Sequence, residues 1–193
     1  MANAATKGKL IIFSAPSGAG KTTLVRYLMS AMDNLEFSVS ACSRKKRPGE
    51  VDGKDYYFMT VDEFKEKIKN GEFIEWEEVY KDHFYGTLRS EVDRIRNSGR
   101  HVVFDVDVKG GLNIKKIFGH DALAIFVKPP SVGTLKERLT RRATDDDREI
   151  ATRVAKAERE LSFADKFDVI IVNDDLEKAK RKTLKVVKDF LKK

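Results

Sequence analysis

Cysteine, proline and tryptophan are scarce in this chain, whose 193 residues include one cysteine, four prolines and one tryptophan. Because Cys42 stands alone, an internal disulfide is excluded, and a reducing compartment fits this composition. Long apolar runs are also missing: no stretch approaches the ~20 residues of a membrane-spanning helix. The N-terminal residues lack the apolar segment of a secretory signal. We therefore expect a cytoplasmic protein without a membrane partner.

Charge, in contrast, is abundant and biased toward the positive sign. Charged residues make up 36% and hydrophobic residues 41% of the chain, which is typical of a globular protein of one domain. The formal net charge is +7, and basic residues concentrate in Arg44–Arg47 and in arginines between residues 138 and 153. Such clusters favour either a nucleic acid or a small polyanion as the ligand, and net charge alone does not distinguish the two.

A glycine-rich segment near the N-terminus carries the strongest chemical signal. The apolar run Leu10–Phe13 leads into Gly18-Ala19-Gly20-Lys21-Thr22, and a helical pattern follows from Leu24. A strand, a glycine-rich loop and a helix N-terminus in this order direct backbone N–H groups and the helix dipole at phosphate. Lys21 then faces the β- and γ-phosphates of a nucleotide, and the Thr22 hydroxyl is placed to bind Mg²⁺.

This segment follows the P-loop consensus with one departure, because the consensus begins with glycine where this chain has Ala15. A methyl group there forbids a positive φ but still permits the loop, since Gly18 and Gly20 lie closest to the phosphates. The predicted nucleotide-binding residues are consecutive in the sequence. They are Ala15, Pro16, Ser17, Gly18, Ala19, Gly20, Lys21, Thr22 and Thr23.

Apolar runs alternate with helical patterns along most of the chain. Buried strands are predicted at residues 10–13, 101–108, 123–127 and 169–172, with helices between them. This alternation predicts a three-layer α/β fold with a central parallel sheet. Residues 36–88 differ: they contain short strand patterns and one small helix that begins with a Thr60–Glu63 capping box. We interpret them as an inserted α+β region with a second binding site.

Five strings in the sequence, taken together and in order, resemble guanylate kinase. They are APSGAGKT (15–22), FSVSACSRKKRPGEVDGKDYYF (37–58), EFIEWEE followed by YGT (72–78 and 85–87), DVDVKG (105–110) and IVNDD (171–175). The resemblance extends from about residue 9 to 190. It implies a P-loop NTPase fold in a single domain spanning 1–193. The core would comprise 9–35, 89–137 and 166–193, with a GMP-binding region at 36–88 and a helical lid at 138–165.

The resemblance also implies an activity and a set of site residues. The activity is transfer of the ATP γ-phosphoryl group to GMP with Mg²⁺, as part of purine nucleotide recycling. The residues implied to hold the GMP phosphate are Arg44, Arg47, Tyr56 and Tyr85. Those implied to read the guanine are Ser40, Glu75 and Thr87, with Asp107 nearby.

On the donor side, the resemblance implies that lid arginines clamp the transferring phosphates and that Asn173 meets the adenine. The lid arginines are Arg138, Arg142 and Arg153, which with Lys21 and Arg44 form the implied catalytic set. Two positions depart from the family pattern: Lys109 stands where glutamine is usual, and Thr87 replaces a common serine.

The chemistry of Glu75 agrees with a guanine ligand independently of the resemblance. A carboxylate accepts hydrogen bonds from guanine N1–H and N2–H₂ together, whereas adenine has no donor at N1 and no 2-amino group. An unmatched buried acceptor costs about 1–3 kcal/mol or more, so a site built in this way discriminates against the wrong base. Asp105 and Asp107, which alternate with valines after a buried run, place carboxylates close to the glycine-rich loop.

Three other functions remain open from the sequence. A related P-loop kinase acting on a sugar phosphate would lack the guanine-reading residues, and a non-catalytic module that binds phosphopeptides would typically have a degraded P-loop. A nucleic-acid-binding protein would explain the net charge and predicts strongly salt-dependent binding to an oligonucleotide. Intact Lys21, Thr22 and Glu75 favour the nucleotide kinase. The oligomeric state is not predicted.

Overall fold

The computed structural model describes residues 7–141 and 147–193, and they form two compact units. The P-loop unit comprises Leu10–Asp33 and Val103–Lys193. The hairpin unit comprises the described residues up to Lys9 together with Asn34–Val102. Among residues 7–141 and 147–193, no helix has both the length and the apolar character that crossing a bilayer requires.

The P-loop unit is built on parallel strands whose apolar runs are buried. Its strands are β1 (Leu10–Ser14), β8 (Ala122–Lys128), β9 (Val169–Val172) and the end of β7 (His101–Asp105). Strand β1 pairs in parallel with β8, and β8 pairs in parallel with β9. All five residues of β1 are buried, as expected for a central strand covered on both faces. The predicted α/β fold with a central parallel sheet is therefore confirmed.

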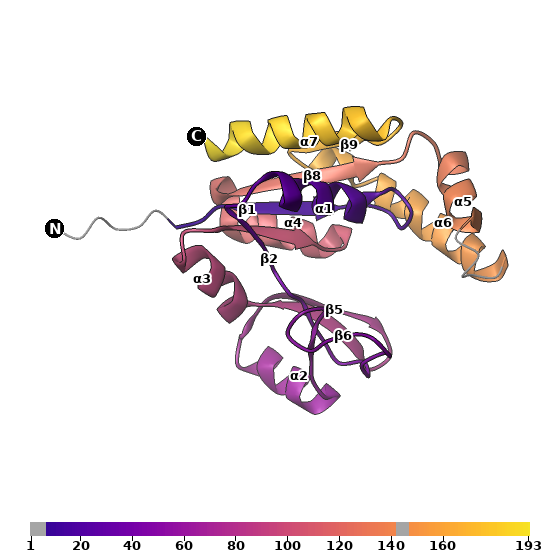
Figure 1. Cartoon of the computed structure of the whole chain (residues 1–193). Helices are drawn as coiled ribbons and strands as arrows, with labels where there is room; N and C mark the ends of the chain where they lie inside the picture. Colours follow the sequence, from indigo (N-terminus) through magenta and orange to yellow (C-terminus); the bar gives the residue numbers. More distant parts are fainter. Residues whose placement is uncertain (1–6, 142–146) are drawn as a thin grey trace. The chain divides into compact units, whose positions relative to one another are not determined.

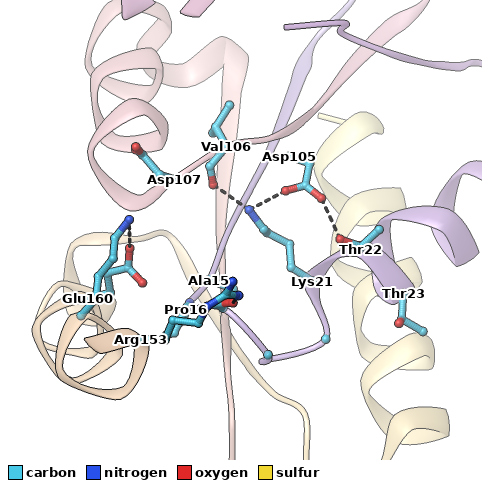
Figure 2. A pocket seen from close by; sticks show the side chains of 14 residues that line it. Ala15, Pro16, Lys21, Thr22, Thr23, Asp105, Val106, Asp107, Arg153 and Glu160 are labelled. Atoms are coloured by element: carbon cyan, nitrogen blue, oxygen red, sulfur yellow. Dashed lines mark hydrogen bonds and ion pairs between the residues drawn. The ribbon is translucent and has the colours of Figure 1, made fainter. Parts of the chain in front are cut away.

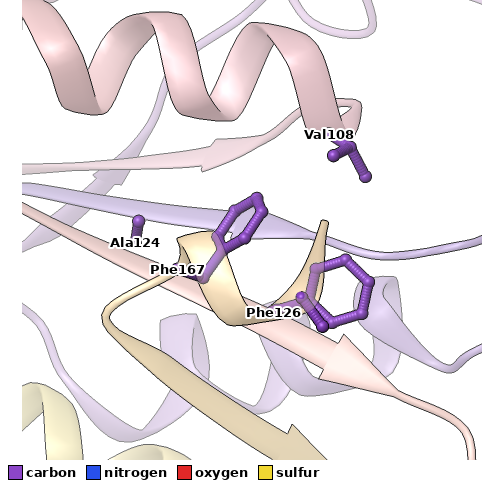
Figure 3. Close-up of a cluster of buried hydrophobic side chains, with 5 residues drawn as sticks. Val108, Ala124, Phe126 and Phe167 are labelled. Atoms are coloured by element: carbon purple, nitrogen blue, oxygen red, sulfur yellow. The ribbon is translucent and has the colours of Figure 1, made fainter. Parts of the chain in front are cut away.

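Helices cover this sheet on both faces (Figure 1). The helices of the unit are α1 (Lys21–Ala31), α4 (Val108–Phe118), α5 (Val132–Arg141), α6 (Asp147–Leu161) and α7 (Leu176–Leu191), with short 3₁₀ turns at Gly119–Asp121 and Ala164–Lys166. Helix α1 packs against α7, and α4 packs on β1 and β8. Figure 3 shows part of the core beneath α4, where the rings of Phe126 and Phe167 lie 5.2 Å apart beside Val108 and Ala124.

The hairpin unit contains a four-stranded sheet of order β4-β3-β6-β5. Its strands are β3 (Ala41–Cys42), β4 (Tyr57–Phe58), β5 (Phe73–Tyr80) and β6 (His83–Leu88), and its helices are α2 (Val61–Lys69) and α3 (Arg89–Asn97). The unit also contains strand β2 (Leu35–Phe37), which lies outside this four-stranded sheet. Strands β5 and β6 form a long antiparallel hairpin.

The core of the hairpin unit is aromatic. The ring of Phe64 on α2 stacks on Phe73 at 4.3 Å and on Phe84 at 5.5 Å between ring centroids. The predicted capping box at the start of α2 is confirmed, because Thr60 accepts from the Glu63 backbone while the Glu63 side chain accepts from the Thr60 backbone. The ring contacts hold α2 against the hairpin that carries Glu75 and Thr87.

Several predicted element boundaries were wrong. The strand expected over residues 101–108 ends at Asp105, because Asp107 accepts a hydrogen bond from the Gly110 N–H at 2.7 Å and thereby caps α4. An aspartate in this position favours a helix start over a continuing strand. The strand predicted at 10–13 continues to Ser14, and the strand predicted at 123–127 spans Ala122–Lys128.

His101, at the start of β7, makes stability of the hairpin unit sensitive to pH. Its Nδ1 accepts a hydrogen bond from the Lys9 N–H at 2.9 Å, and burial lowers the pKa of the imidazole below its ordinary 6.5. The folded chain therefore binds fewer protons than the unfolded chain as the pH falls through that value. We expect the free energy of unfolding to be highest above pH 6.5 and to decrease below it.

Urea unfolding between pH 5 and pH 8 measures this dependence, with His101→Gln as the test variant. The substitution removes the titrating group, so the decrease below about pH 6.5 becomes shallower. His120→Gln, at an exposed position, is the matched control and retains the wild-type slope. Equal slopes for wild type and His101→Gln would contradict the prediction.

Candidate active site

The glycine-rich loop connects β1 directly to α1, as the sequence predicts. Gly18 and Gly20 have φ values of 87° and 93°, in the left-handed region that favours glycine. A hydrogen bond of 3.1 Å from the Ala19 N–H to the Pro16 carbonyl closes the loop. Ala15 is buried, and its φ is negative: among the described residues other than glycine, positive φ is found at Asp82. The departure from the consensus at Ala15 therefore costs no backbone strain.

Lys21 and Thr22 meet at the end of β7. The Lys21 ammonium donates to the Val106 carbonyl at 2.9 Å and forms an ion pair with the Asp105 carboxylate. The Thr22 hydroxyl donates to the other oxygen of Asp105 at 3.2 Å (Figure 2). Asp105 thus fixes the two residues that the sequence assigned to phosphate and Mg²⁺.

The donor atoms at this point fit Mg²⁺. The cation prefers oxygen ligands and is usually bound by one or two protein groups together with substrate phosphates and water. Thr22 and Asp105 supply a hydroxyl and a carboxylate side by side. Within residues 7–141 and 147–193, no cluster of three or more His, Cys, Asp or Glu residues forms a complete metal site. A Mg²⁺ ion held here would take its other ligands from phosphate and water.

A cavity of about 380 Å³ opens above the loop. The loop, the end of β7 and helix α6 contribute its walls. The residues lining it are Ala15, Pro16, Ser17, Gly18, Gly20, Lys21, Thr22, Thr23, Asp105, Val106, Asp107, Arg153, Lys156 and Glu160. A cavity at a glycine-rich loop and a helix N-terminus is suited to a polyphosphate.

Among the three lid arginines expected to clamp phosphates, the structure brings Arg153 to the cavity, where its guanidinium lies 3.4 Å from the Ser17 hydroxyl. Arg138 instead donates to the Asn173 backbone carbonyl at 3.0 Å. Arg142 lies outside the described residues. Sequence reasoning missed Lys156 and Glu160, although their spacing from Arg153 places them on the same helix face.

Asn173, expected at the adenine, braces the loop. Its side chain is 5% exposed, and its Nδ2 donates to the Ala19 carbonyl at 2.8 Å. A Cβ at Gly20 would lie 2.2 Å from that nitrogen, so the amide packs tightly under the loop. Sequence reasoning missed this contact because 154 positions separate the two residues. The expected adenine contact stays a prediction.

Replacing Asn173 tests this bracing role. In Asn173→Ala the buried Ala19 carbonyl loses its donor, which costs about 1–3 kcal/mol of stability. We expect a lower melting temperature and a raised KM for ATP, because the loop loses its fixed conformation. Asn113→Ala, at an exposed position on α4, is the control. An unchanged melting temperature together with an unchanged KM for ATP would contradict the role.

Asp107, expected close to the guanine, belongs to the P-loop unit. Its carboxylate caps α4 and lines the cavity, and its backbone carbonyl accepts from the Ser14 hydroxyl at 2.9 Å. These contacts give Asp107 a structural role at the cavity above the glycine-rich loop, here called the donor cavity because the phosphoryl donor is expected there. The contact of Asp107 with guanine stays a prediction. Lys109, which stands where the family pattern usually has glutamine, is exposed in the first turn of α4.

In the hairpin unit, two of the expected guanine-reading residues lie together. Glu75 on β5 pairs directly with Thr87 on β6, and the Thr87 hydroxyl donates to the Glu75 carboxylate at 2.6 Å. Thr87 is 1% exposed, so its hydroxyl is fixed in this orientation. The third expected residue, Ser40, is followed by β3, and its backbone carbonyl accepts from Tyr57 at 2.9 Å.

The residues expected to hold a phosphate also gather in the hairpin unit. The guanidinium carbon of Arg44 lies 4.9 Å from the centroid of the Tyr56 ring, and the Tyr56 and Tyr85 rings meet edge to face at 6.0 Å. Burial raises the pKa of Tyr56, so its phenol remains a hydrogen-bond donor at neutral pH. Two hydroxyls and a guanidinium form a donor set suited to phosphate.

Glu50 orients this phosphate cluster and was missed from the sequence. Its carboxylate accepts two hydrogen bonds from the Arg44 guanidinium, at 2.6 and 2.7 Å, and one from the Arg47 backbone at 2.8 Å. The Arg44 contacts lower the pKa of Glu50 to about 2, and Glu50 in turn raises the pKa of Arg44. The side chain of Arg47 is exposed. Arg44 is therefore held in place before any anion binds.

Comparison with known proteins adds independent information. The family model described as guanylate kinase matches residues 7–193. The guanylate kinase of Bacteroides thetaiotaomicron is 56% identical over 186 residues, covering 96% of this chain and 91% of that protein. That of Salinibacter ruber is 48% identical over 182 residues, covering 94% and 96%. The crystal structure of guanylate kinase from Anaplasma phagocytophilum is 30% identical, with a TM-score of 0.76, covering 97% of this chain and 88% of that chain.

Proposed function

Because this chain belongs to the guanylate kinase family, we propose that it transfers the γ-phosphoryl group of ATP to GMP, giving ADP and GDP. It is an enzyme of the phosphotransferase class with a P-loop NTPase fold. The observation that carries the proposal is that one chain holds two built anion sites. The first is the loop cavity with Lys21 and Thr22. The second is the cluster of Arg44, Tyr56 and Tyr85 in the hairpin unit, which also contains the Glu75–Thr87 pair.

On the donor side, the loop N–H groups and Lys21 would hold the β- and γ-phosphates of ATP, and Arg153 would add charge from the lid. Thr22, with Asp105 beside it, would hold Mg²⁺ together with the phosphates. When bound, the cation neutralises charge on the β- and γ-phosphate oxygens. Lys21 is already directed by Asp105 and Val106, so the protein positions its charge before the nucleotide arrives.

On the acceptor side, Glu75 would accept from guanine N1–H and N2–H₂, with Thr87 fixing its carboxylate. Arg44, Tyr56 and Tyr85 would hold the GMP phosphate. That phosphate is already ionised at neutral pH, so the reaction needs no strong general base. Catalysis is then positional and electrostatic, without a covalent intermediate on the enzyme.

Further expectations from the sequence accompany this proposal. We propose the division into a core, a GMP-binding region at 36–88 and a lid at 138–165, a cytoplasmic location and a role in recycling GMP. The Glu75–Thr87 pair supports guanine rather than a sugar phosphate as the acceptor. The placement of Lys21 supports a kinase rather than a phosphopeptide-binding module. We propose small nucleotides, and no nucleic acid, as the partners.

A coupled assay of ADP release across several acceptors tests the proposed function. We expect turnover with GMP, far less with AMP, and none with ribose 5-phosphate. Isothermal calorimetry should find one site for MgATP and a separate site for GMP on each chain. Turnover with ribose 5-phosphate but not with GMP would contradict the proposal, as would tight oligonucleotide binding at ~150 mM salt without kinase activity.

A further inference from the structure

Helix α6 directs three charged residues at the donor cavity. Arg153, Lys156 and Glu160 are separated by three and four positions, so they share one face of the helix, and all three line the cavity. Arg153 reaches the Ser17 hydroxyl, so this face of α6 is in contact with the glycine-rich loop. Lys156 and Glu160 follow it within two turns of the helix.

The charges lining the cavity are balanced only if Lys156 is included. The cavity is lined by three cations, Lys21, Arg153 and Lys156, and by three carboxylates, Asp105, Asp107 and Glu160. Lys21 is paired with Asp105. Without Lys156, the lining would hold two cations and three carboxylates, and this net negative charge would disfavour a polyphosphate.

The contact between Lys156 and Glu160 is loose. Their nearest nitrogen and oxygen atoms are 3.7 Å apart, which is long for a hydrogen bond, and Figure 2 marks this ion pair beside Glu160. The Lys156 side chain is 62% exposed, whereas Glu160 is 15% exposed. A lysine four positions before a glutamate is also the less favourable order for helix stability. The pair therefore holds the lysine at the cavity without engaging all of its N–H donors.

From this arrangement we propose that Lys156 is a further cation of the donor site, donating a hydrogen bond to an oxygen of the ATP triphosphate. Glu160 is a positioning residue, which keeps the flexible lysine at the cavity when no nucleotide is bound. On binding, a phosphate oxygen supplies the closer partner, since a charge-assisted hydrogen bond is stronger than an ion pair at 3.7 Å. This inference rests on the proposed function only in taking ATP as the donor.

Binding of MgATP, measured by calorimetry without GMP, tests the role of Lys156. We expect Lys156→Met to raise the dissociation constant of MgATP about tenfold and to reduce its salt dependence, because one charged contact to phosphate is lost. Lys156→Arg keeps the charge and should stay within about threefold of wild type. Adenosine, which has no phosphate, should bind wild type and Lys156→Met equally.

The matched control is Lys185→Met. Lys185 and Asp189 on α7 form an exposed lysine-to-acid pair with the same spacing, 2.8 Å apart, away from the lining of the cavity. This variant should bind MgATP like wild type. An unchanged dissociation constant in Lys156→Met, or an equal loss for MgATP and adenosine, would overturn the proposal.

Glu160→Gln tests the positioning role in a double-mutant cycle. In the Lys156→Met background it should restore about threefold in MgATP affinity, because it removes an unbalanced carboxylate, whereas in wild type it should give no gain. An equal gain in both backgrounds would show that the two residues are uncoupled and would overturn this role. If wild type binds MgATP but does not phosphorylate GMP, the proposed function fails while the binding result for Lys156 still stands.

Discussion

Replacement of Lys21 by methionine is expected to lower the rate of phosphoryl transfer about 10³-fold or more. The ammonium is held at the donor cavity by the Val106 carbonyl and the Asp105 carboxylate, so its charge is in place before the reaction begins. Without it, the negative charge that develops on the transferring group loses a fixed partner. The Asp105 carboxylate also loses its counter-charge and repels the triphosphate. Steady-state kinetics with saturating GMP measure the effect.

Two variants separate this chemical role from loss of structure. Lys128→Met changes an exposed lysine of the same unit and should leave turnover unchanged. Lys21→Met should retain the wild-type circular dichroism spectrum and should still bind GMP, because the residues proposed for the acceptor belong to the hairpin unit. A folded Lys21→Met protein that retains more than about a tenth of the wild-type rate would remove Lys21 from the catalytic residues.

The structure agrees with the sequence best where the signal is local. The geometry of the glycine-rich loop follows from adjacent residues: a buried strand, two glycines with positive φ and a helix that starts at Lys21. The Thr60–Glu63 capping box is local in the same way. Each of these features is fixed by neighbours a few positions apart, so residue type and spacing are sufficient to predict it.

Contacts between residues far apart in the sequence were harder to predict from the sequence. That Asn173 supports the loop depends on a hydrogen bond to Ala19, and no pattern in the sequence connects the two positions. Glu50 could have been noticed, because a carboxylate three residues after Arg47 in a basic loop has few other partners. The end of the strand predicted at 101–108 was missed because the helix cap Asp107 has a valine on either side, although an aspartate is itself a signal for a helix start.

The second large effect is expected from Glu75→Gln. In the wild type the Thr87 hydroxyl lies 2.6 Å from the Glu75 carboxylate. The amide of the variant keeps an oxygen that can accept this hydrogen bond, so the hairpin should remain intact. It replaces the other acceptor by an NH₂ group, which opposes the N–H donors of guanine. We expect kcat/KM for GMP to fall about 10²- to 10³-fold, because two hydrogen bonds to a charged acceptor are lost or weakened.

The decisive quantity is the ratio of kcat/KM for GMP to that for AMP. AMP offers no donor at N1 and no 2-amino group, so its turnover should not fall with Glu75→Gln, and the discrimination between the two bases should narrow. Glu78→Gln is the control on the same strand: its side chain accepts from the Asp82 N–H at 2.8 Å, and the amide oxygen can keep that bond. If Glu75→Gln lowered GMP and AMP turnover equally, Glu75 would be stabilising the hairpin rather than reading the base.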